Sequence, residues 1–445
     1  MVSNSAAAAR AEFAARACLD SPGELDEATR LLCELATAPD PELARGGVDG
    51  IFRHAVETMG DAFEPALCDR YIEFFTRVVD YCRRLPQGAA LDAELRRFGL
   101  LRRDEIVERA RRVRRVRAAP ASLRPRKIVV LSRVTLGADV TVTSVVLAHL
   151  LRRFPEARLT LVAPRKSAQL FAGESRVATR VLEYPRGGGL LQRLEGWLAA
   201  ERAVCAEVAG LGPGEWIVVD PDSRFTQLGL LPVTVDESQY YFFESRSYAR
   251  PGRATLGSLT AAWLEEVFGP VEPAPEPWIR LPPTKARREG RWASLNFGVG
   301  DNPRKRVADP FEEELLLGLL ERGWRVFLDQ GDGDEELARS GRLLDALGAR
   351  GWRLGSDVVS WQGSIAGFAA LIAASDLYIG YDSACQHIAA ALAVKTVDIF
   401  AGFRSRRMVE RWRPAGRGEV RMVVVEPDRP PDCGRLLAQV LEAAG

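Results

Sequence analysis

Apolar residues recur at two different periods along the chain, and the change falls near residue 118. Before it, in segments such as GELDEATRLLCELA and CDRYIEFFTRVVDYCRRL, the apolar positions have helical spacing and β-branched runs are absent. Prolines at positions 39, 41, 65 and 86 divide this region into several helices. The pattern predicts an all-α N-terminal domain over residues 1–118.

From Lys127 onward, short apolar runs alternate with helical segments. KIVVLSR, ARLTLVAP and WIVVD have the composition of buried strands, and VTSVVLAHLLRRF has the spacing of a helix. The same alternation returns in WASLNFG, WRVFLDQ, LYIGYD and KTVDIF. Strands that alternate with helices predict βαβ units around parallel sheets.

A proline-rich segment, PVEPAPEPWIRLPPT at residues 270–284, separates the two α/β series. Such a segment is semi-extended and is typical of a linker. We therefore predict one α/β domain over residues 119–270 and a second over residues 271–445. Ligands of such folds bind beyond the carboxyl ends of the strands, so we expect a site in a cleft between the two sheets.

The composition narrows the functional class. The chain has 445 residues, with 61 basic against 60 acidic ones, and this formal charge of +1 argues against a nucleic-acid binder. No apolar run reaches the roughly 18 residues of a membrane span, and the first residues lack the pattern of a secretion signal. The seven cysteines and three histidines form no CxxC or ordered ligand set. These features predict a cytoplasmic protein with reduced thiols and without a metal site.

One region departs from this neutral balance. Residues 96–127 hold twelve arginines and one lysine against three acidic residues, a local charge of +10. The simplest interpretation is a solvated helix face followed by a linker. The alternative is an anionic partner: acidic parts of the chain itself, or a membrane surface that carries a lipid-linked acceptor, which would place the protein at the inner membrane face.

The stretch LYIGYDSACQHIAAALAVKTVDIFAGF, residues 377–403, is the most informative for chemistry. A buried strand ends at Tyr381, and an alanine-rich helix follows the turn Asp382-Ser383-Ala384. The amides and the positive end of that helix would face outward from the sheet edge, where they suit an anion. The alternatives are that Asp382 or Ser383 only caps the helix and that His387 is a structural residue.

The pattern G-x-D-S-x-x-x-H-x-A-A-A-L-x-x-x-T-V-x-I-F-x-G in this stretch resembles the nucleotide-sugar motif of the heptosyltransferase-like glycosyltransferases, family 9. Those enzymes have two Rossmann-like domains in the GT-B arrangement, and they transfer a sugar from a nucleoside diphosphate with inversion and without a metal. The resemblance implies that Asp382, Ser383, Ala384 and His387 line the donor diphosphate and sugar. The family usually has glycine where this chain has Ala384.

Two further segments resemble the donor half of the family. LNFGVGDNPRKRV matches the loop that opens the C-terminal domain, which implies that Gly298 and Val299 approach the phosphates and that Lys305 stabilises the leaving diphosphate. Val307 stands where the family has tryptophan, and the alternative is that Lys305 belongs to a solvated basic loop. FLDQGDGDEE matches the ribose-binding segment, with Glu335 as the candidate and Glu336 next to it; the alternative is a helix N-terminus enriched in acids.

The first α/β domain carries the acceptor side of the resemblance. LSRVTLGADVTVTSVVLAHLLRRF matches the block whose aspartate is the proposed catalytic base, which implies Asp139, although Ala138 is an extra residue before it. An inverting transfer needs such a base to take the proton of the acceptor hydroxyl. The alternative is that Asp139 caps a helix. WIVVDPDSRFTQLGLLP resembles a later strand, which implies Asp220 and Arg224 on the acceptor side.

We therefore predict an α/β fold with two Rossmann-like domains in the GT-B arrangement, facing a cleft and preceded by an all-α domain. The predicted activity is inverting, metal-independent transfer of a sugar, with heptose suggested by the family, from a nucleoside-diphosphate donor to a glycan, lipid-linked or protein acceptor, without a cofactor. The alternatives are a nucleotide-sugar epimerase or hydrolase of the same architecture, or a binding protein that has lost catalysis. A dinucleotide enzyme is disfavoured because no G-x-G-x-x-G follows the first strand.

Overall fold

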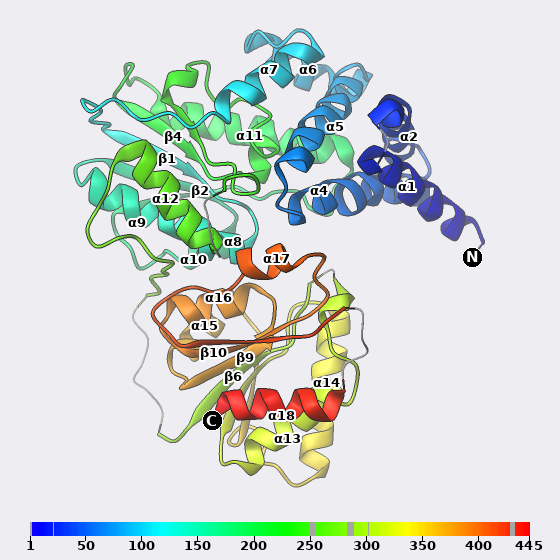
Figure 1. Cartoon of the computed structure of the whole chain (residues 1–445), viewed down its shortest axis with the longest axis vertical. Coiled ribbons are helices and arrows are strands. Elements are labelled where there is room, and N and C mark those ends of the chain that lie inside the picture. The colour runs from blue at the N-terminus through cyan, green and yellow to red at the C-terminus, as the bar shows by residue number, and fades with distance from the viewer. Residues whose placement is uncertain (1, 21, 250–253, 283–288, 301, 428–431) are drawn as a thin grey trace.

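A computed structural model describes residues 2–20, 22–249, 254–282, 289–300, 302–427 and 432–445. It has an N-terminal group of helices and two α/β units that are stacked along the long axis of the molecule (Figure 1). Residues 283 and 284, the end of the predicted linker, lie outside the described residues.

The N-terminal region is helical, as the apolar spacing predicts. Proline at the first position begins two of its helices, because the missing N–H costs nothing there, and the Asp40 carboxylate also caps one of them by accepting from the amide of Glu42 at 2.8 Å. The helices are α1 (Val2–Asp20), α2 (Leu25–Ala36), α3 (Pro41–Asp49), a π-helical segment (Gly50–Val56), α4 (Glu57–Asp61), α5 (Pro65–Arg83), α6 (Ala89–Arg97) and α7 (Arg103–Val113).

The first sheet has five strands in the order β3-β2-β1-β4-β5, and all of its pairs are parallel. Its central strands are apolar in their interior because helices cover both faces, and the charged residues Lys127 and Asp220 stand at strand ends. The strands are β1 (Lys127–Leu131), β2 (Arg158–Ala163), β3 (Val177–Val181), β4 (Trp216–Asp220) and β5 (Tyr240–Phe242), and the helices are α8 (Leu136–Ala138), α9 (Ser144–Arg153), α10 (Arg165–Gln169), α11 (Leu190–Val208) and α12 (Leu256–Phe268).

The second sheet has six parallel strands in the order β11-β10-β9-β6-β7-β8. The two sheets preceded by helices confirm the predicted fold class. The strands are β6 (Trp292–Asn296), β7 (Arg325–Asp329), β8 (Val358–Trp361), β9 (Leu377–Tyr381), β10 (Lys395–Phe400) and β11 (Val420–Val424), and the helices are α13 (Phe311–Glu321), α14 (Asp334–Ala349), α15 (Ile365–Ala373), α16 (Ala384–Ala391), α17 (Arg406–Arg411) and α18 (Cys433–Ala444).

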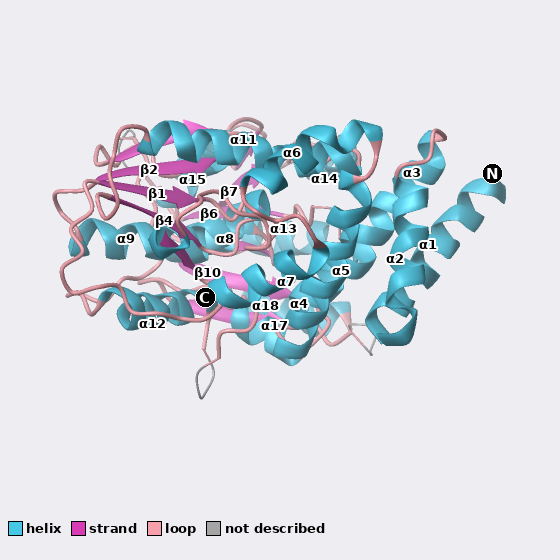
Figure 2. Cartoon of the chain, turned by 90° about the horizontal axis from the view of Figure 1, so that it is seen from above, coloured by secondary structure: helices cyan, strands magenta, loops and turns pink. Residues whose placement is uncertain are grey.

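The N-terminal helices share a hydrophobic core with the first sheet. One continuous cluster of buried residues runs from α1, α2 and α5 to Val129, Val218 and Phe242 of that sheet. Seen from above, these helices gather at one end of the molecule (Figure 2). Burial of shared apolar surface makes the helices and the first α/β unit one packed body.

The basic run 96–127 mostly contacts the chain itself. Arg114 pairs with Glu244 at 2.6 Å, Lys127 pairs with Glu207 at 2.5 Å, and Arg117 donates to three backbone carbonyls around β5. Acidic and carbonyl groups of the first α/β unit therefore take up much of the predicted positive charge. Binding of an anionic membrane by this run stays a prediction, and these contacts do not support it. Among the described residues, no helix is long and apolar enough to cross a membrane.

Candidate functional site

The motif residues predicted for the donor lie at the carboxyl edge of the second sheet. Asp382 follows β9 directly, and α16 begins at Ala384. The Ser383 hydroxyl makes no capping hydrogen bond to the helix, and the Asp382 carboxylate is turned to other partners. Ser383 and Ala384 are partly exposed, so uncapped amides at the positive end of α16 face outward, which is an arrangement that suits an anion.

Lys305 is held against Asp382. Its Nζ lies 2.5 Å from the Asp382 Oδ2 and 3.2 Å from the Asp382 carbonyl oxygen, while the amide of Gln386 donates to Oδ1 at 2.7 Å. Burial alone would lower the pKa of Lys305, but the Asp382 carboxylate outweighs burial and raises the pKa, so the ammonium group is charged. The alternative of a solvated loop is wrong for Lys305, whose side chain is only 20% exposed. Val307, the departure from the family pattern, is buried in the core of the second domain.

Two polar residues that the sequence analysis did not select complete this edge. Asn296 ends β6 and Asp329 ends β7, and the Asn296 amide donates to Asp329 Oδ2 at 2.6 Å. The Ser383 hydroxyl donates to Asn296 Oδ1 at 3.3 Å. The ends of β9, β6 and β7 are therefore linked side by side. The sequence signal for Asn296 and Asp329 was a polar residue at the end of each of two neighbouring predicted strands.

The predicted phosphate loop meets Glu336 rather than Glu335. A Cβ atom on Gly298 would lie 2.9 Å from Glu336 Oε1, so the absence of a side chain there permits the contact. Glu336 also lines a small cavity together with Gly298 and Asp329. Glu335 is exposed, and Val299 is partly buried against the core of the second domain. The structure thus brings Glu336 to the site and leaves Glu335 in solvent.

His387 lies where α16 meets the first α/β domain. Its side chain is buried, its ring centroid is 5.9 Å from that of Trp412, and a Cβ on Gly137 would lie 3.1 Å from its Cδ2. Burial lowers the pKa of His387 to about 4, so the imidazole is neutral at pH 7. Its Nδ1 has no hydrogen-bond partner among the described residues. A neutral ring between two domains can act as a hydrogen-bonding group but not as a cation.

Asp139 is fully buried, and both of its carboxylate oxygens are occupied. Oδ1 accepts from the Arg133 amide at 2.7 Å and from the Thr143 hydroxyl at 2.7 Å, and Oδ2 accepts from the hydroxyls of Ser132 and Ser167 at 2.7 and 2.5 Å. Its exposed fraction is 0%. Asp139 therefore ties the loop after β1 to neighbouring segments. The predicted role as base stays untested, and this placement gives the carboxylate no access to an acceptor.

Asp220 has a similar place at the end of β4. It is fully buried and accepts from the Ser223 amide, the Thr226 hydroxyl and the Tyr240 hydroxyl at 2.7, 2.6 and 2.6 Å. Burial raises the pKa of Asp220 to about 6. It shapes the loop after β4 and does not face an acceptor. Arg224, in the same loop, is half-buried, and among the described residues its guanidinium makes no hydrogen bond or ion pair. The guanidinium is therefore available to a ligand.

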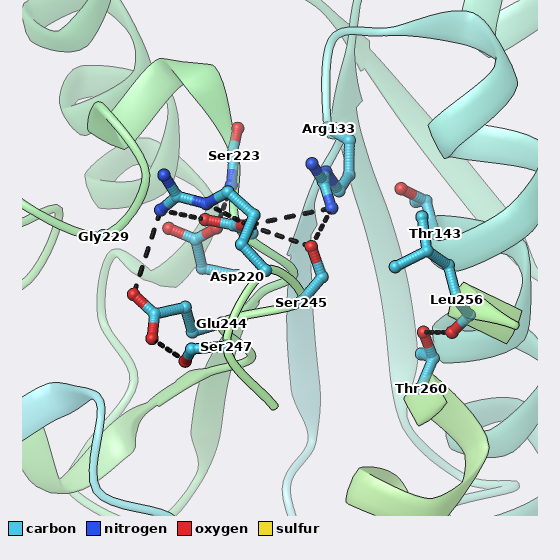
Figure 3. Close-up of polar contacts among 12 residues, drawn as sticks. Arg133, Thr143, Asp220, Ser223, Gly229, Glu244, Ser245, Ser247, Leu256 and Thr260 are labelled. Atoms are coloured by element: carbon cyan, nitrogen blue, oxygen red, sulfur yellow. Dashed lines mark hydrogen bonds and ion pairs between the residues drawn. The ribbon is translucent and has the colours of Figure 1, made fainter. Parts of the chain in front are cut away.

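A buried ion pair organises the side of the first α/β domain that is predicted for the acceptor. The Arg246 guanidinium donates to both oxygens of Asp222 at 3.0 and 3.1 Å, and Arg133 Nη1 lies 3.8 Å from Asp222 Oδ2. Figure 3 shows the Arg133 side chain pointing toward Ser245, to which it donates. Burial would raise the pKa of Asp222, but the two guanidiniums outweigh it and lower the pKa. This network fixes the loops after β1 and β4 relative to each other.

We expect Asp139→Asn to lower the free energy of unfolding by about 1–3 kcal/mol, because an amide nitrogen cannot accept from the Arg133 N–H or from the surrounding hydroxyls. Urea denaturation measures the change. Asp332→Asn is the matched control, since that carboxylate is 63% exposed in a surface pair, and it should shift stability little. Unchanged stability in Asp139→Asn, together with lost ligand binding, would contradict the structural role.

The described residues contain no group of histidine, cysteine, aspartate or glutamate side chains placed to hold a metal ion. A separate cavity of about 1090 Å³ lies on the linker side, between α12, residues 270–277 and the loop before β11. None of the predicted site residues lines it. The candidate site is therefore the edge of the second sheet that faces the loops after β1 and β4.

The family model for glycosyltransferase family 9 (heptosyltransferase) matches residues 309–424. A glycosyl transferase family 9 structure from Veillonella parvula has a TM-score of 0.54 and 15% identity, covering 74% of this chain and 98% of its own. The E. coli ADP-heptose lps heptosyltransferase II has a TM-score of 0.50 and 15% identity, covering 72% of this chain and 98% of its own. No curated protein has a significant match to the chain.

At this identity the two structures establish the fold alone, which is the predicted pair of Rossmann-like units in a GT-B-like arrangement. The family model covers the segment that contains Asp382, Ser383, Ala384 and His387. The match over residues 309–424 and the fold together confirm the predicted resemblance to glycosyltransferase family 9.

Proposed function

We propose that this protein is an inverting glycosyltransferase that takes a sugar from a nucleoside-diphosphate donor without a metal ion. The observation that carries the proposal is the charged Lys305 beside the uncapped start of α16. A fixed cation and free amides at one sheet edge stabilise the charge that grows on a departing diphosphate. They would supply the electrostatic stabilisation that a metal gives in other enzymes.

The donor lies along the ends of β6, β7 and β9 in this proposal. Lys305, Ser383 and Ala384 face the diphosphate, and Gly298 allows it to approach the backbone closely. Glu336 accepts from the ribose hydroxyls in place of Glu335, because Glu336 is the carboxylate that reaches Gly298. The similar E. coli structure is that of an ADP-heptose lps heptosyltransferase, so ADP-heptose is the first donor to test.

The acceptor enters from the first α/β domain, next to Arg224. Burial lowers the pKa values of Arg186 and Arg193, and the charge of Arg224 lowers both of them further. Arg186 and Arg193 therefore lie near Arg224. This positive lining favours an acceptor that carries carboxylate or phosphate groups near the reacting hydroxyl. Such an acceptor is a glycan, a lipid-linked sugar or a protein.

Calorimetric titration with ADP, UDP and GDP, with and without EDTA, tests the donor site. We expect one diphosphate to bind and EDTA to leave the affinity unchanged. NMR of the sugar product then reports the anomeric configuration, which should be inverted relative to the donor. A protein that binds none of the three diphosphates, or that loses binding in EDTA, would contradict the proposal.

A second candidate is a nucleotide-sugar-binding protein without catalysis. It is favoured by one observation: the residue predicted as base, Asp139, is buried with every oxygen engaged. The two candidates differ in turnover. Binding of a nucleoside diphosphate without consumption of its sugar derivative, with water or with any acceptor tried, would select the second candidate.

A further inference from the structure

The segment from α4 to the start of α5 reaches from the helical region to the candidate site. The Arg404 guanidinium donates to the Thr58 hydroxyl at 2.7 Å, and the Arg407 guanidinium donates to the Phe63 carbonyl at 2.9 Å. The Phe63 ring packs edge-on against Trp412, with centroids 6.5 Å apart. Trp412 in turn contacts His387. One residue on each side of Asp61, Thr58 and Phe63, is therefore fixed to the second domain.

The same segment touches the first α/β domain. A Cβ on Gly60 would lie 3.6 Å from Cδ of Arg246, the arginine that holds Asp222. Figure 1 shows α4 on the side of the helical region that faces the second domain. Asp61, the last residue of α4, thus lies where the helical region and both α/β domains meet.

The Asp61 carboxylate has no described bonding partner at this junction. It is partly exposed, and within the described residues no hydrogen bond or ion pair engages it. Burial and the nearby Glu57 raise the pKa of Asp61 to about 6, against the opposing charges of Arg404, Lys305 and Arg224. The Asp61 charge in turn contributes to the raised pKa of Lys305. The carboxylate is therefore within electrostatic range of Lys305, the predicted diphosphate-binding lysine, and of Arg224, on the side predicted for the acceptor.

Asp61 has the accessible carboxylate oxygens that Asp139 lacks. A general base needs an open oxygen, reach to the acceptor hydroxyl and a pKa near the working pH. Asp139 has four donors on its two oxygens and no exposure, whereas Asp61 has open oxygens at the junction of the donor and acceptor sides.

We propose that Asp61 of the helical region is the general base of the transfer, an inference that rests on the proposed function. The acceptor oxygen forms a bond to the anomeric carbon, and the bond from that carbon to the diphosphate oxygen breaks. The electron pair leaves on the diphosphate, next to Lys305, and the acceptor proton passes to the Asp61 carboxylate. The N-terminal helices thereby contribute a residue to the reaction.

The pH dependence follows from the groups around Asp61. These are Glu57 on the same helix, Arg224 from the first α/β domain, and Lys305 and Arg404 from the second. The base acts in its ionised form, so kcat/KM should fall as the pH drops through about 6. Glu57→Gln removes the like charge, so the acid limb of the profile should move to lower pH.

The experiment measures release of nucleoside diphosphate from the sugar donor whose diphosphate binds in calorimetry, with water as the acceptor. Asp61→Asn should reduce turnover by about 100-fold or more, as expected for loss of general base catalysis, and should lose the acid limb. Diphosphate affinity should change less than threefold by calorimetry. Thermal stability should stay unchanged, because no hydrogen bond is lost. Formate, a small carboxylate, should restore part of the turnover of Asp61→Ala.

Glu64→Gln is the matched control, an exposed acid three residues away, and it should leave turnover and the pH profile unchanged. Turnover of Asp61→Asn within tenfold of the wild type, with diphosphate still bound, would overturn the role of Asp61 while the proposed function stands. Wild-type protein that binds no nucleoside diphosphate would overturn both.

Discussion

Lys305→Met is expected to weaken binding of the nucleoside diphosphate by roughly 30- to 150-fold, which corresponds to about 2–3 kcal/mol for a charge-assisted contact. The ammonium group is charged and already oriented by Asp382, so binding costs little free energy to order this side chain. Methionine keeps an unbranched side chain that is one atom shorter, and it removes the charge. Calorimetric titration of the wild type and the variant measures the ratio of dissociation constants.

Lys127→Met is the control for Lys305→Met. Lys127 also forms a partly buried ion pair, with Glu207 at 2.5 Å and a side chain 16% exposed, but it begins β1 at the amino end of the strand, away from the candidate site. We expect its diphosphate affinity to equal that of the wild type. Equal affinities in Lys305→Met and the wild type would place the diphosphate elsewhere.

Arg109→Ala is expected to lower the free energy of unfolding by about 3 kcal/mol, because it leaves two buried carbonyls without a donor and opens a cavity. Arg109, on α7, is only 2% exposed and donates to the carbonyls of Gly229 and Leu230 at 2.9 and 3.1 Å. It also lies over the Tyr240 ring, 5.4 Å from the centroid. Urea denaturation followed by circular dichroism measures the change.

Arg111→Ala separates this anchoring role from the charge of the basic run. Arg111 belongs to the same helix, is exposed and has no described contact, so its removal should change stability by less than about 0.5 kcal/mol. Equal effects of the two substitutions would mean that the run acts through its summed charge. A large effect of Arg109→Ala alone would show that it anchors the helices to the first α/β domain.

The elements that the sequence predicted best have a strong local period. The strands within KIVVLSR and LYIGYD are buried because helices cover both faces of each sheet, and such strands read as short, nearly continuous apolar runs. The donor motif was also predictable, because Asp382, Ser383 and His387 lie within one turn and the helix that follows it. The prediction named Glu335 before Glu336 because the sequence does not distinguish two adjacent acids at the start of a helix. The contact of Glu336 with the loop at Gly298 distinguishes them.

The sequence alone determined the fold class and the family resemblance, and it predicted the sheet edge proposed for the donor, since each depends on residues close together in the chain. Only the tertiary structure decided which carboxylate is open. Asp139 is closed because Ser132, Thr143 and Ser167 from three segments fold around it. Asp61 is open because the helix that carries it docks between two domains without giving it a donor. Accessibility and pKa depend on such long-range neighbours, and no local pattern records them.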